Sequence, residues 1–372
     1  MENKALDEKD IQNIKRQALE KLRSIGNEIL EQIKAGENPY LEIPIRNLSN
    51  IKFNKEKRIL ELGSALSKRY YLDVGAVRKF VQTLSVAAVT RALIEERTHA
   101  HLRDIFYMLK KTLANTNIDL VYEQVESDKA VEDLELITGF SREQLNIGAD
   151  KRGVVAGEVV IEDNTDTIDW SRMGSGGWSI PSNTEELVFK KVDADFVLVM
   201  EKNDLWERLN EDKVWKKLHC IIMGTQGQAT RGTRRLLQRL NNEYDLPVYV
   251  LTDFDPWGIY IYSVIKFGSI NLAHASERLA LPEAKFVGLR HDDIAKYNLK
   301  KHIIRFKDVD FKRLEQISNY DWFKNNKDWQ DELSKMNSLA GKVELNALAA
   351  NGIKFISERY IPEKIKEGEF LD

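Results

Sequence analysis

Cysteine is almost absent from this sequence of 372 residues, in which Cys220 stands alone. A single cysteine rules out an intrachain disulfide framework and suits a reducing cytoplasm. Long apolar runs are missing as well, since the longest, such as LSVAAV and FVLVM, fall far short of the roughly 20 residues that span a bilayer. The N-terminus, MENKALDEKD, lacks a basic start followed by an apolar core. We therefore expect no secretory signal and no membrane partner.

A strong excess of charge of either sign is also missing. The formal net charge is -3, with 42% hydrophobic and 31% charged residues. This balance is typical of globular proteins, and a chain of this length is expected to fold as two or three domains. A nucleic-acid partner would have to bind a local basic patch, because the protein as a whole is not basic.

A nucleotide-binding loop is absent too. The glycine-rich segment MGSGGWSIP, residues 173–181, matches neither GxxxxGK[ST] nor GxGxxG, and Pro181 closes it where a helix should begin. This pattern predicts a flexible loop. The sequence therefore contains no Walker-type nucleotide site.

The N-terminal part of the chain has a helical period. Isoleucine, leucine and alanine recur at helical spacing over residues 10–34, and Gly36 and Pro39 follow. This predicts one long amphipathic helix. Its apolar stripe must pack either on this chain or on another subunit, and the sequence leaves both possibilities open.

Short helices and a hairpin follow a mixed stretch that gives no clear prediction. A helical pattern returns at Asp73, Thr98 is expected to cap a helix over 99–113, and Ser141 with Gln144 forms a capping-box pattern. The valine-rich runs GVVAGEVVIED and TIDW then predict a hairpin. Helices followed by a hairpin are the order expected of a winged-helix module.

Strands and helices alternate from Phe196 onward. FVLVME, CIIMGT and PVYVLT read as strands, and each is followed by a helical segment. Such alternation predicts an α/β domain with a parallel sheet covered on both faces. Glu201 ends the first strand, and Asp253 and Asp255 follow the third. Ligands of open parallel sheets bind at the carboxyl ends of the strands, so these carboxylates are expected to gather at one edge.

Oxygen ligands without histidine or cysteine favour a hard cation such as Mg²⁺. Phosphoryl transfer is the chemistry that such a site usually serves. The alternative is that Asp253 and Asp255 only shape the turn before Pro256 and Gly258. The position of Glu201, level with the pair at the end of a neighbouring strand, favours the metal site.

Basic residues accompany these acids. In the helical segment GTQGQATRGTRRLLQRL, Arg231, Arg235 and Arg239 are spaced by four residues, and Arg234 lies beside them. This arrangement fits a solvated helix face and also a track for a phosphate backbone. The sequence leaves both open.

The helix predicted over 99–113 carries a tyrosine among cations. Tyr107 lies about 100° off the apolar stripe, Arg103 shares its face one turn earlier, and Lys110 and Lys111 flank it. A phenol is a poor nucleophile at neutral pH unless nearby positive charge favours the phenolate. Arg103 is suited to that role, although an exposed tyrosine is by itself ordinary.

Together these motifs resemble the A subunit of DNA topoisomerase VI, in the type IIB family that also includes the meiotic double-strand-break transesterases. LRDIFY resembles the nucleophile motif, VLVMEK and LPVYVLTDFDPWGIYIYS resemble the glutamate and DxD motifs of the Toprim fold, and GQATRGTRRLLQRL resembles the TR motif. The resemblance runs from about Leu41 to the C-terminus. Where relatives often have two adjacent tyrosines this chain has Phe106 and Tyr107, and Ala229 stands where they often have proline.

The resemblance implies a mixed α/β architecture in three parts. These are an N-terminal helical extension over 1–70 that docks a partner, a winged-helix DNA-binding domain over 71–165 carrying the tyrosine, and a Toprim domain with a C-terminal extension over 185–372. It implies Tyr107 as nucleophile, assisted by Arg103, and Mg²⁺ held by Glu201, Asp253 and Asp255. The basic residues are expected to contact DNA, and they are Arg231, Arg234, Arg235, Lys110 and Lys111.

Several partners are implied by the same resemblance. Double-stranded DNA is the substrate, and the A subunits form a homodimer in which the tyrosine of one chain meets the metal site of the other. ATP is bound by a separate GHKL-type ATPase B subunit, which gives an A2B2 enzyme that relaxes supercoils and decatenates DNA. The expected location is the cytoplasm, in association with the nucleoid.

Three alternative functions are compatible with parts of the sequence. The first is a meiotic-type transesterase. The second is a haloacid-dehalogenase-type phosphatase, but Pro256 and Trp257 stand where that family usually has threonine or valine, and its later acids, Asp292 and Asp293, follow no apolar strand. The third is a winged-helix scaffold that binds DNA without cutting it and is indifferent to Glu201→Gln.

Overall fold

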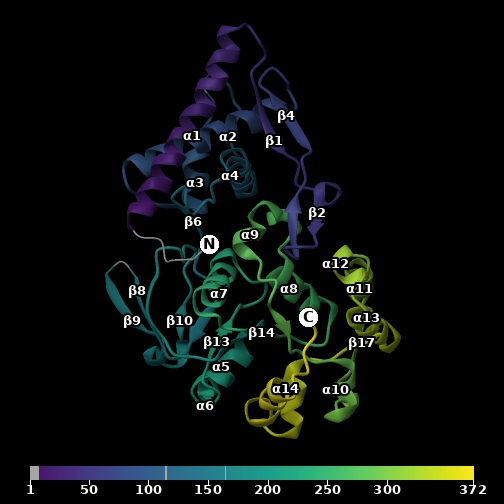
Figure 1. Ribbon diagram of the computed structural model, residues 1–372. Helices are drawn as coiled ribbons and strands as arrows, with labels where there is room; N and C mark the ends of the chain where they lie inside the picture. The colour runs from purple at the N-terminus through teal and green to yellow at the C-terminus, as the bar shows by residue number, and fades with distance from the viewer. Residues whose placement is uncertain (1–7, 114, 164) are drawn as a thin grey trace. The chain divides into compact units, whose positions relative to one another are not determined.

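The computed structural model describes residues 8–113, 115–163 and 165–372 (Figure 1). Contacts divide the chain into two compact units. Among the described residues, one consists of residues 8–52 and 62–150, here called the helical unit, and the other of residues 53–61 and 151–372, here called the sheet unit. The division differs from the boundaries expected at 70, 165 and 185. No helix in the described ranges has the length and apolarity to cross a membrane.

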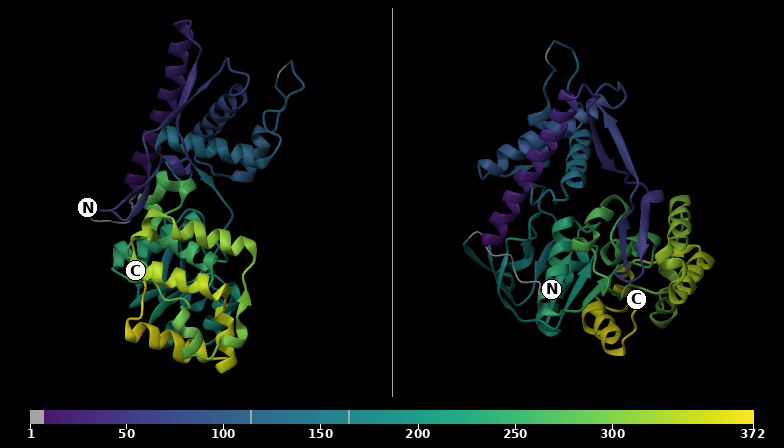
Figure 2. Two further views of the ribbon diagram at one scale, coloured as in Figure 1. Left: turned by 90° about the vertical axis from the view of Figure 1, so that its right-hand side faces the viewer. Right: turned by 45° about the horizontal axis from the view of Figure 1, so that its top comes forward.

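The predicted N-terminal helix is confirmed as α1, Glu8–Lys34. Its apolar stripe packs on the chain's own helical unit, which answers the question that the sequence left open. Ala18 and Leu22 are buried in the core with α2, Val77–Glu95, and Ile25 and Ile29 are buried beside β1, Tyr40–Pro44. Figure 2 shows α1, in purple, alongside the helices of this unit. The rest of its surface stays exposed, including Leu30 and Ile33.

The helix that carries Tyr107 is shorter than expected. It is α3, Leu102–Leu109, so the prediction that Thr98 caps it is wrong. Residues Ala100–His101 form strand β5 instead, and the Asp104 carboxylate accepts a hydrogen bond from the His101 N–H at 2.8 Å. The helix ends at Leu109 because the chain then folds back, with the Leu120 N–H donating to the Lys111 carbonyl at 3.0 Å.

The capping-box pattern at Ser141 and Gln144 forms without a helix behind it. The Ser141 N–H donates to the Gln144 side chain at 2.9 Å, and the Gln144 N–H donates to Ser141 Oγ at 3.3 Å. The segment makes one turn and then enters β6, Ile147–Gly148, which pairs with β5. The remaining elements of the helical unit are α4, Gln124–Thr138, and β4, Leu66–Tyr70, which pairs with β1.

The sheet unit is built around a six-stranded sheet with the order β10-β7-β13-β12-β14-β15. The three predicted strands are confirmed, and the four that run from β13 to β15 are parallel neighbours. The apolar runs fit this position because strands covered on both faces have no polar side to present. The bounds are β12 Phe196–Met200, β13 Cys220–Gly224, β14 Val248–Leu251 and β15 Lys285–Phe286.

The strand order determines where a ligand can bind. The chain moves from β12 to β13 through α5, Asn203–Glu211, and then returns past β12 to β14 through α7, Arg231–Tyr244. Because such crossovers are right-handed, opposite directions put α5 and α7 on opposite faces of the sheet, as Figure 1 shows. The direction reverses at β12. The carboxyl end of β12 is therefore the topological switch point, where open sheets bind their ligands.

Antiparallel strands extend the sheet on the side of β13. The predicted hairpin is confirmed as β8, Val159–Asp163, with β9, Asp166–Asp169, but contacts assign it to the sheet unit and not to the unit of Tyr107. The glycine-rich segment is more ordered than expected. Trp178–Ser179 forms β10 and pairs with β7, Val154–Ala156, and the Trp178 ring stacks on Trp170 at 5.4 Å.

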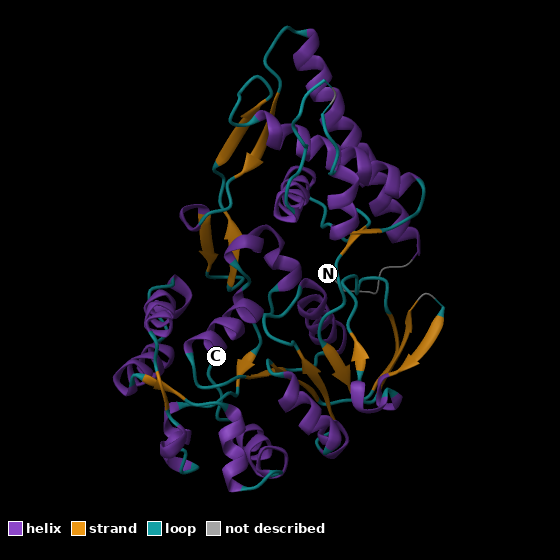
Figure 3. Cartoon of the chain, turned by 180° about the vertical axis from the view of Figure 1, so that it is seen from behind, coloured by secondary structure: helices purple, strands orange, loops and turns teal. Residues whose placement is uncertain are grey.

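Further helices enclose the sheet, which Figure 3 shows among them from behind. A hairpin from the N-terminal half, β2 Ile51–Asn54 with β3 Ile59–Leu62, contributes its tip to this unit, and β11, Val188–Val192, pairs with β8. The other α-helices are α6 Val214–Lys217, α8 Pro256–Phe267, α9 Ser276–Leu279, α10 His291–Lys296, α11 Asp308–Ser318, α12 Asp321–Lys324, α13 Lys327–Leu339 and α14 Ile361–Glu367. The short strands β16 Ile304–Arg305 and β17 Gly341–Lys342 form a separate pair.

Candidate functional site

Three carboxylate residues lie at the switch point. Met200 of β12 is in register with Leu251 of β14, so Glu201 follows its strand at the level where the DxD segment begins. Adjacent strands are about 4.8 Å apart, which brings these residues near each other although about fifty positions separate them in sequence. The residues are Glu201, Asp253 and Asp255.

Electrostatics shows that the three acids interact. Burial, and then the charges of Asp255 and Asp253, raise the pKa of Glu201 to about 7. Burial also raises the pKa of Asp255 to about 6, with a further contribution from Asp253. Like charges disfavour one another's ionised forms in this way, and a bound cation would relieve the repulsion. The site is therefore built to be more stable with positive charge inside it.

Asp253 and Asp255 are held by different parts of the fold. Asp253 is 5% exposed, and its Oδ1 accepts a hydrogen bond from the Leu345 N–H at 2.8 Å. Asp255 is the N-cap of α8, where its Oδ1 accepts from the Gly258 N–H. The turn-shaping role that the sequence offered as an alternative is thus real for Asp255, because an aspartate suits a helix N-terminus. In each aspartate a backbone N–H thus occupies the Oδ1 atom.

The donor set fits a hard divalent cation. It consists of carboxylate oxygens, with no thiol or imidazole among them, which is the chemistry that Mg²⁺ prefers. Another positive charge is already present, since Lys202 Nζ lies 2.8 Å from Asp253 Oδ2. Burial alone would lower the pKa of Lys202, but its hydrogen bond and attraction to Asp253 raise it. Asp253 is thus already paired with one cation, the ammonium group of Lys202.

A second acidic cluster lies at the opposite end of the strands. Within the described ranges, the one set of ligand atoms that all lie within 4.8 Å of one another belongs to Glu158, Asp193 and His219. These residues stand near the starts of β12 and β13, whereas Glu201 follows the end of β12. Lys191 Nζ lies 2.8 Å from Asp193, and His219 Nδ1 lies 3.2 Å from Asp195. The cluster is an ion-pair network separate from the switch point.

Tyr107 lies on the exposed face of α3, as predicted. Its side chain is 57% exposed, while Ile105 and Leu109 on the opposite face are buried in the helical unit. Arg103 Nη2 lies 3.5 Å from Tyr107 Oη, and the guanidinium carbon lies 5.7 Å from the ring centroid. The two side chains therefore share one surface.

The lysines after this helix are placed differently from each other. Lys110 is the C-cap of α3, and its Nζ lies 5.3 Å from the ring centroid of Phe106. Lys111 is exposed, and its carbonyl belongs to the turn that follows the helix. Both lysines are therefore near the tyrosine in the chain, with Lys110 leaning on the neighbouring aromatic ring.

The arginines of α7 do not form the open helix face that their spacing suggests. Arg239 is 2% exposed and donates to the carbonyls of Thr184 and Leu187 at 2.6 and 2.9 Å. Arg235 makes a two-pronged contact with Glu185. Although burial opposes it, Arg235 and Arg278 lower the pKa of Glu185 to about 2. The interpretation as a solvated face is wrong, because these side chains connect α7 to the loop at residues 184–187.

Arg234 differs from the other arginines of α7. It is 3% exposed, and its Nε and Nη1 have no hydrogen-bond partner in the described part of the chain. Burial and the neighbouring Arg231, which is also buried, lower the pKa of Arg234 to about 10. It therefore stays charged at neutral pH. Buried guanidinium groups are normally paired, so this one is suited to an anion.

Models of known protein families match three successive parts of the chain. A family model for the Toprim domain shared by the topoisomerase 6 A subunit and Spo11 matches residues 196–365. One for type IIB DNA topoisomerase matches residues 78–147, and one for the all-beta domain in the DNA topoisomerase VI alpha subunit matches residues 151–193. The fold and the acidic switch point thus define a chain of the type IIB topoisomerase class.

Individual relatives narrow the class. The chain is 45% identical to the A subunit of type 2 DNA topoisomerase 6 from Pyrococcus abyssi, over 95% of each chain. It is 38% identical to that of Hyperthermus butylicus, over 96% of this chain and 97% of the relative, and 33% identical to that of Methanocaldococcus jannaschii, over 94% and 95%. The chain belongs to the family of type 2 DNA topoisomerase 6 A subunits.

Sequence reasoning overlooked two residues of the site. Lys202 directly follows Glu201 and could have been found from the VLVMEK motif, since a cation next to a predicted metal ligand is informative. Glu344 lies 3.2 Å from Lys202 Nζ but is far away in the sequence. No local signal marks it.

Proposed function

We propose that this chain cleaves and rejoins DNA as the A subunit of a type IIB topoisomerase. In this proposal Tyr107 is the nucleophile, and Glu201, Asp253 and Asp255 hold Mg²⁺. The observation that carries it is the position of these three acids at the switch point of the sheet, where Asp253 is buried, Glu201 and Asp255 are half-buried, and burial and the neighbouring aspartates raise the pKa of Glu201. Family membership supplies DNA as the substrate. No feature of the site favours the phosphatase interpretation.

The proposed reaction is a transesterification. Tyr107 Oη attacks a backbone phosphorus, and the bond from phosphorus to the 3' oxygen breaks. The phenol loses a proton and the 3' oxygen gains one, which leaves a 5'-phosphotyrosyl link and a free 3'-hydroxyl. The reverse reaction rejoins the strand. Arg103, 3.5 Å from Tyr107 Oη, would favour the phenolate. Bound Mg²⁺ would stabilise negative charge on the phosphate or on the leaving oxygen.

The DNA contacts follow the division of the chain. We assign residues 71–165 to a winged-helix DNA-binding domain that carries the tyrosine, although its hairpin after Gly153 packs with the sheet unit, and we assign residues 185–372 to the metal-binding domain. Among the basic residues, Arg234 has the strongest support, because two of its donors are unpartnered in the described part of the chain. Lys110 and Lys111 are supported by their exposure next to α3. Arg235 is held by Glu185, so its predicted phosphate contact has less support.

The working enzyme in this proposal contains more than one chain. Two A subunits form a homodimer in which the tyrosine of each meets the metal site of the other, so that each chain cuts one strand. ATP is bound by a GHKL-type B subunit in an A2B2 complex that relaxes and decatenates DNA at the nucleoid. The relatives support a second kind of chain, because each of them is named as one lettered component of its topoisomerase.

A trapping assay tests the proposed function. The full chain is mixed with the B subunit, end-labelled duplex DNA, Mg²⁺ and a non-hydrolysable ATP analogue, and the mixture is denatured. We expect the label to remain covalently attached to this chain. If the DNA is bound but the chain never becomes labelled, the protein is the DNA-binding scaffold and not the transesterase.

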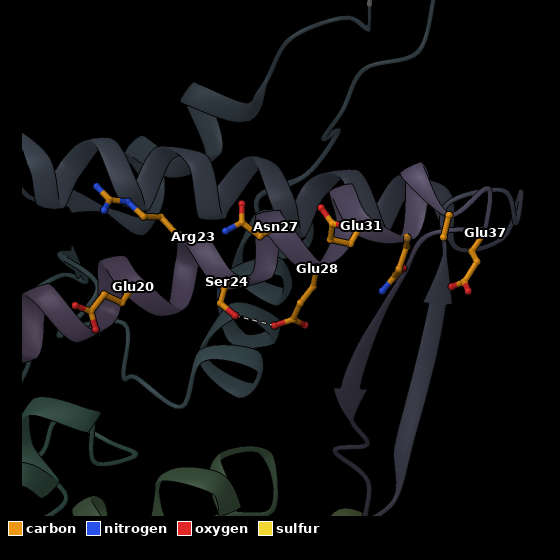
Figure 4. A pocket seen from close by; sticks show the side chains of 9 residues that line it. Glu20, Arg23, Ser24, Asn27, Glu28, Glu31 and Glu37 are labelled. Atoms are coloured by element: carbon orange, nitrogen blue, oxygen red, sulfur yellow. Dashed lines mark hydrogen bonds between the residues drawn. The ribbon is translucent and has the colours of Figure 1, made fainter.

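The exposed face of α1 is our candidate for docking the B subunit. A shallow groove runs along this face, and it is lined by more acidic than basic side chains. Figure 4 shows the side chains that line it. Glu28 accepts from Ser24 Oγ at 2.8 Å, and Arg23 is the one basic residue lining the groove. A basic partner surface would complement it. The lining residues are Glu20, Arg23, Ser24, Asn27, Glu28, Glu31, Gln32, Ala35 and Glu37.

Charge reversal on this face should weaken the complex. For the double variant Glu28→Lys/Glu31→Lys we expect at least about a tenfold loss of affinity for the B subunit, because rim charges steer and select partners. Substitution is preferable to removal of the helix, since Leu22 and Ile25 of α1 are buried. The control is Glu56→Lys/Glu315→Lys, at exposed residues of the sheet unit. Equal affinities of the two variants in surface plasmon resonance would refute the docking proposal.

A further inference from the structure

Lys202 lies between two carboxylates of unequal exposure. Its Nζ is 2.8 Å from Asp253 Oδ2 and 3.2 Å from Glu344 Oε2. The Asp253 side chain is 6% exposed, whereas the Glu344 side chain is 51% exposed. The ammonium group therefore touches one buried acid of the candidate metal site and one acid that is largely in water.

The Lys202 ammonium group neutralises the buried carboxylate of Asp253. Asp253 Oδ1 already accepts the Leu345 N–H, and a buried carboxylate without a cation would be costly. Lys202 provides that cation at Oδ2, the oxygen that the Leu345 N–H leaves open. A divalent ion that binds Asp253 at this oxygen must compete with the ammonium group.

Glu344 is positioned to receive the ammonium group. It immediately precedes Leu345, and the same segment is fixed to the DxD loop, because Phe254 and Val343 exchange backbone hydrogen bonds at 3.0 and 3.1 Å. These hydrogen bonds thus fix the two backbone segments that carry Asp253 and Glu344, the acids that contact Lys202. Only the flexible four-carbon stem of Lys202 has to move.

We propose that Lys202 is a displaceable counter-ion of the metal site. It neutralises Asp253 until a divalent cation binds, and it then pairs with Glu344 alone. The inference rests on the proposed function, because it takes Asp253 as a metal ligand. In this inference Lys202 competes with the metal for Asp253. The competition keeps the bound metal exchangeable, and Lys202 neutralises Asp253 when no metal is bound.

Direct metal binding tests the exchange. Mn²⁺ is titrated into the full chain, and free Mn²⁺ is measured by electron paramagnetic resonance. We expect Lys202→Met to bind Mn²⁺ about tenfold more tightly than the wild type, since the competitor is gone, and to have a lower melting temperature in EDTA. The matched control is Lys296→Met, which removes the same charge from a lysine that also lies near two carboxylates, 3.2 Å from Glu367 and 3.7 Å from Glu369. Its affinity should stay within about twofold of the wild type.

Two further variants separate exchange from general electrostatics. Lys202→Arg keeps the charge but holds a carboxylate with a rigid fork, so it should bind Mn²⁺ more weakly than the wild type. Glu344→Gln should weaken Mn²⁺ binding a few-fold in the wild type and have no effect in the Lys202→Met background. Circular dichroism checks that each variant is folded.

The possible outcomes distinguish this inference from the proposed function. If Lys202→Met binds Mn²⁺ no more tightly than the wild type, the counter-ion proposal is overturned while the metal site stands. If Glu201→Gln binds Mn²⁺ as well as the wild type does, the metal site itself is misassigned. Tighter binding in Lys202→Met with no change in Lys296→Met supports the exchange.

Discussion

Replacing Tyr107 with phenylalanine should abolish covalent attachment of DNA to this chain. The variant lacks only the phenolic oxygen, which is the proposed nucleophile, so we expect at least about a thousandfold less adduct in the trapping assay. DNA binding should stay within about twofold, because Tyr107 is 57% exposed and its ring remains. The measurement is the labelled fraction of the chain after denaturation.

The matched control is Tyr122→Phe. Tyr122 is also exposed, at 51%, and lies beside an arginine, since the guanidinium of Arg78 is 4.3 Å from its ring centroid. This variant should form adduct like the wild type. An adduct that survives in Tyr107→Phe, or one that is lost equally in Tyr122→Phe, would show that the nucleophile is misassigned.

Mixed dimers test whether the site is shared between two chains. When Tyr107→Phe chains are combined with Glu201→Gln chains, a mixed dimer has one intact site only if the tyrosine of one chain meets the metal site of the other. We then expect nicked DNA, cut in one strand. If each site is contained within one chain, both sites are defective and no cleavage above either parent is expected.

Replacing Glu201 with glutamine should have two opposite effects. It should reduce adduct formation at least about a hundredfold, because a metal ligand is lost. In EDTA it should stabilise the protein from about pH 4.5 upward, with the full effect above about pH 7. Burial and two neighbouring aspartates raise the pKa of Glu201 from 4.5 to about 7, so the folded state favours its protonated form.

The sign of the pH dependence follows from this shift. Below pH 4.5 Glu201 is protonated in both the folded and the unfolded state, and the two proteins should be equally stable. As the pH rises from 4.5 to about 7, the wild type loses stability, because the Glu201 carboxyl ionises in the unfolded state while it stays mostly protonated in the folded state. At pH 8 the glutamine variant should be more stable by up to about 3 kcal/mol.

Melting temperatures in EDTA from pH 4 to 8 check this prediction. Mg²⁺ at pH 8 should raise the melting temperature of the wild type more than that of the variant. The control is Glu211→Gln, at a 72% exposed side chain, which should show no such pH dependence. A constant difference between Glu201→Gln and the wild type at every pH would contradict the assigned environment of Glu201.

Local patterns in the sequence were enough to predict the elements of the site. The apolar runs become β12, β13 and β14, and the helical stripe with Tyr107 on its far side becomes α3. Glu201 and the two aspartates are predicted at one sheet edge because parallel strands place their carboxyl ends together. These features depend on periodicity and on strand direction, which neighbouring residues determine.

The sequence could not predict which side chains are buried or which distant residues they contact. The spacing of the α7 arginines is the same whether the face is solvated or covered, and only the packed loop at Thr184–Leu187 shows that it is covered. The hairpin after Gly153 has the right pattern for a wing, yet its strand contacts belong to the sheet unit.

By itself, therefore, the sequence determined the class of the fold, the family, the nucleophile candidate and the three acidic residues, since each rests on a local pattern or a contiguous motif. Only the tertiary structure decided that α1 is part of the core of its own unit, that two side-chain nitrogens of Arg234 have no hydrogen-bond partner within the described residues, and that Lys202 joins Asp253 to Glu344. The physical reason is that a contact between residues far apart in the chain is made by packing, and packing leaves no periodic signal in either segment.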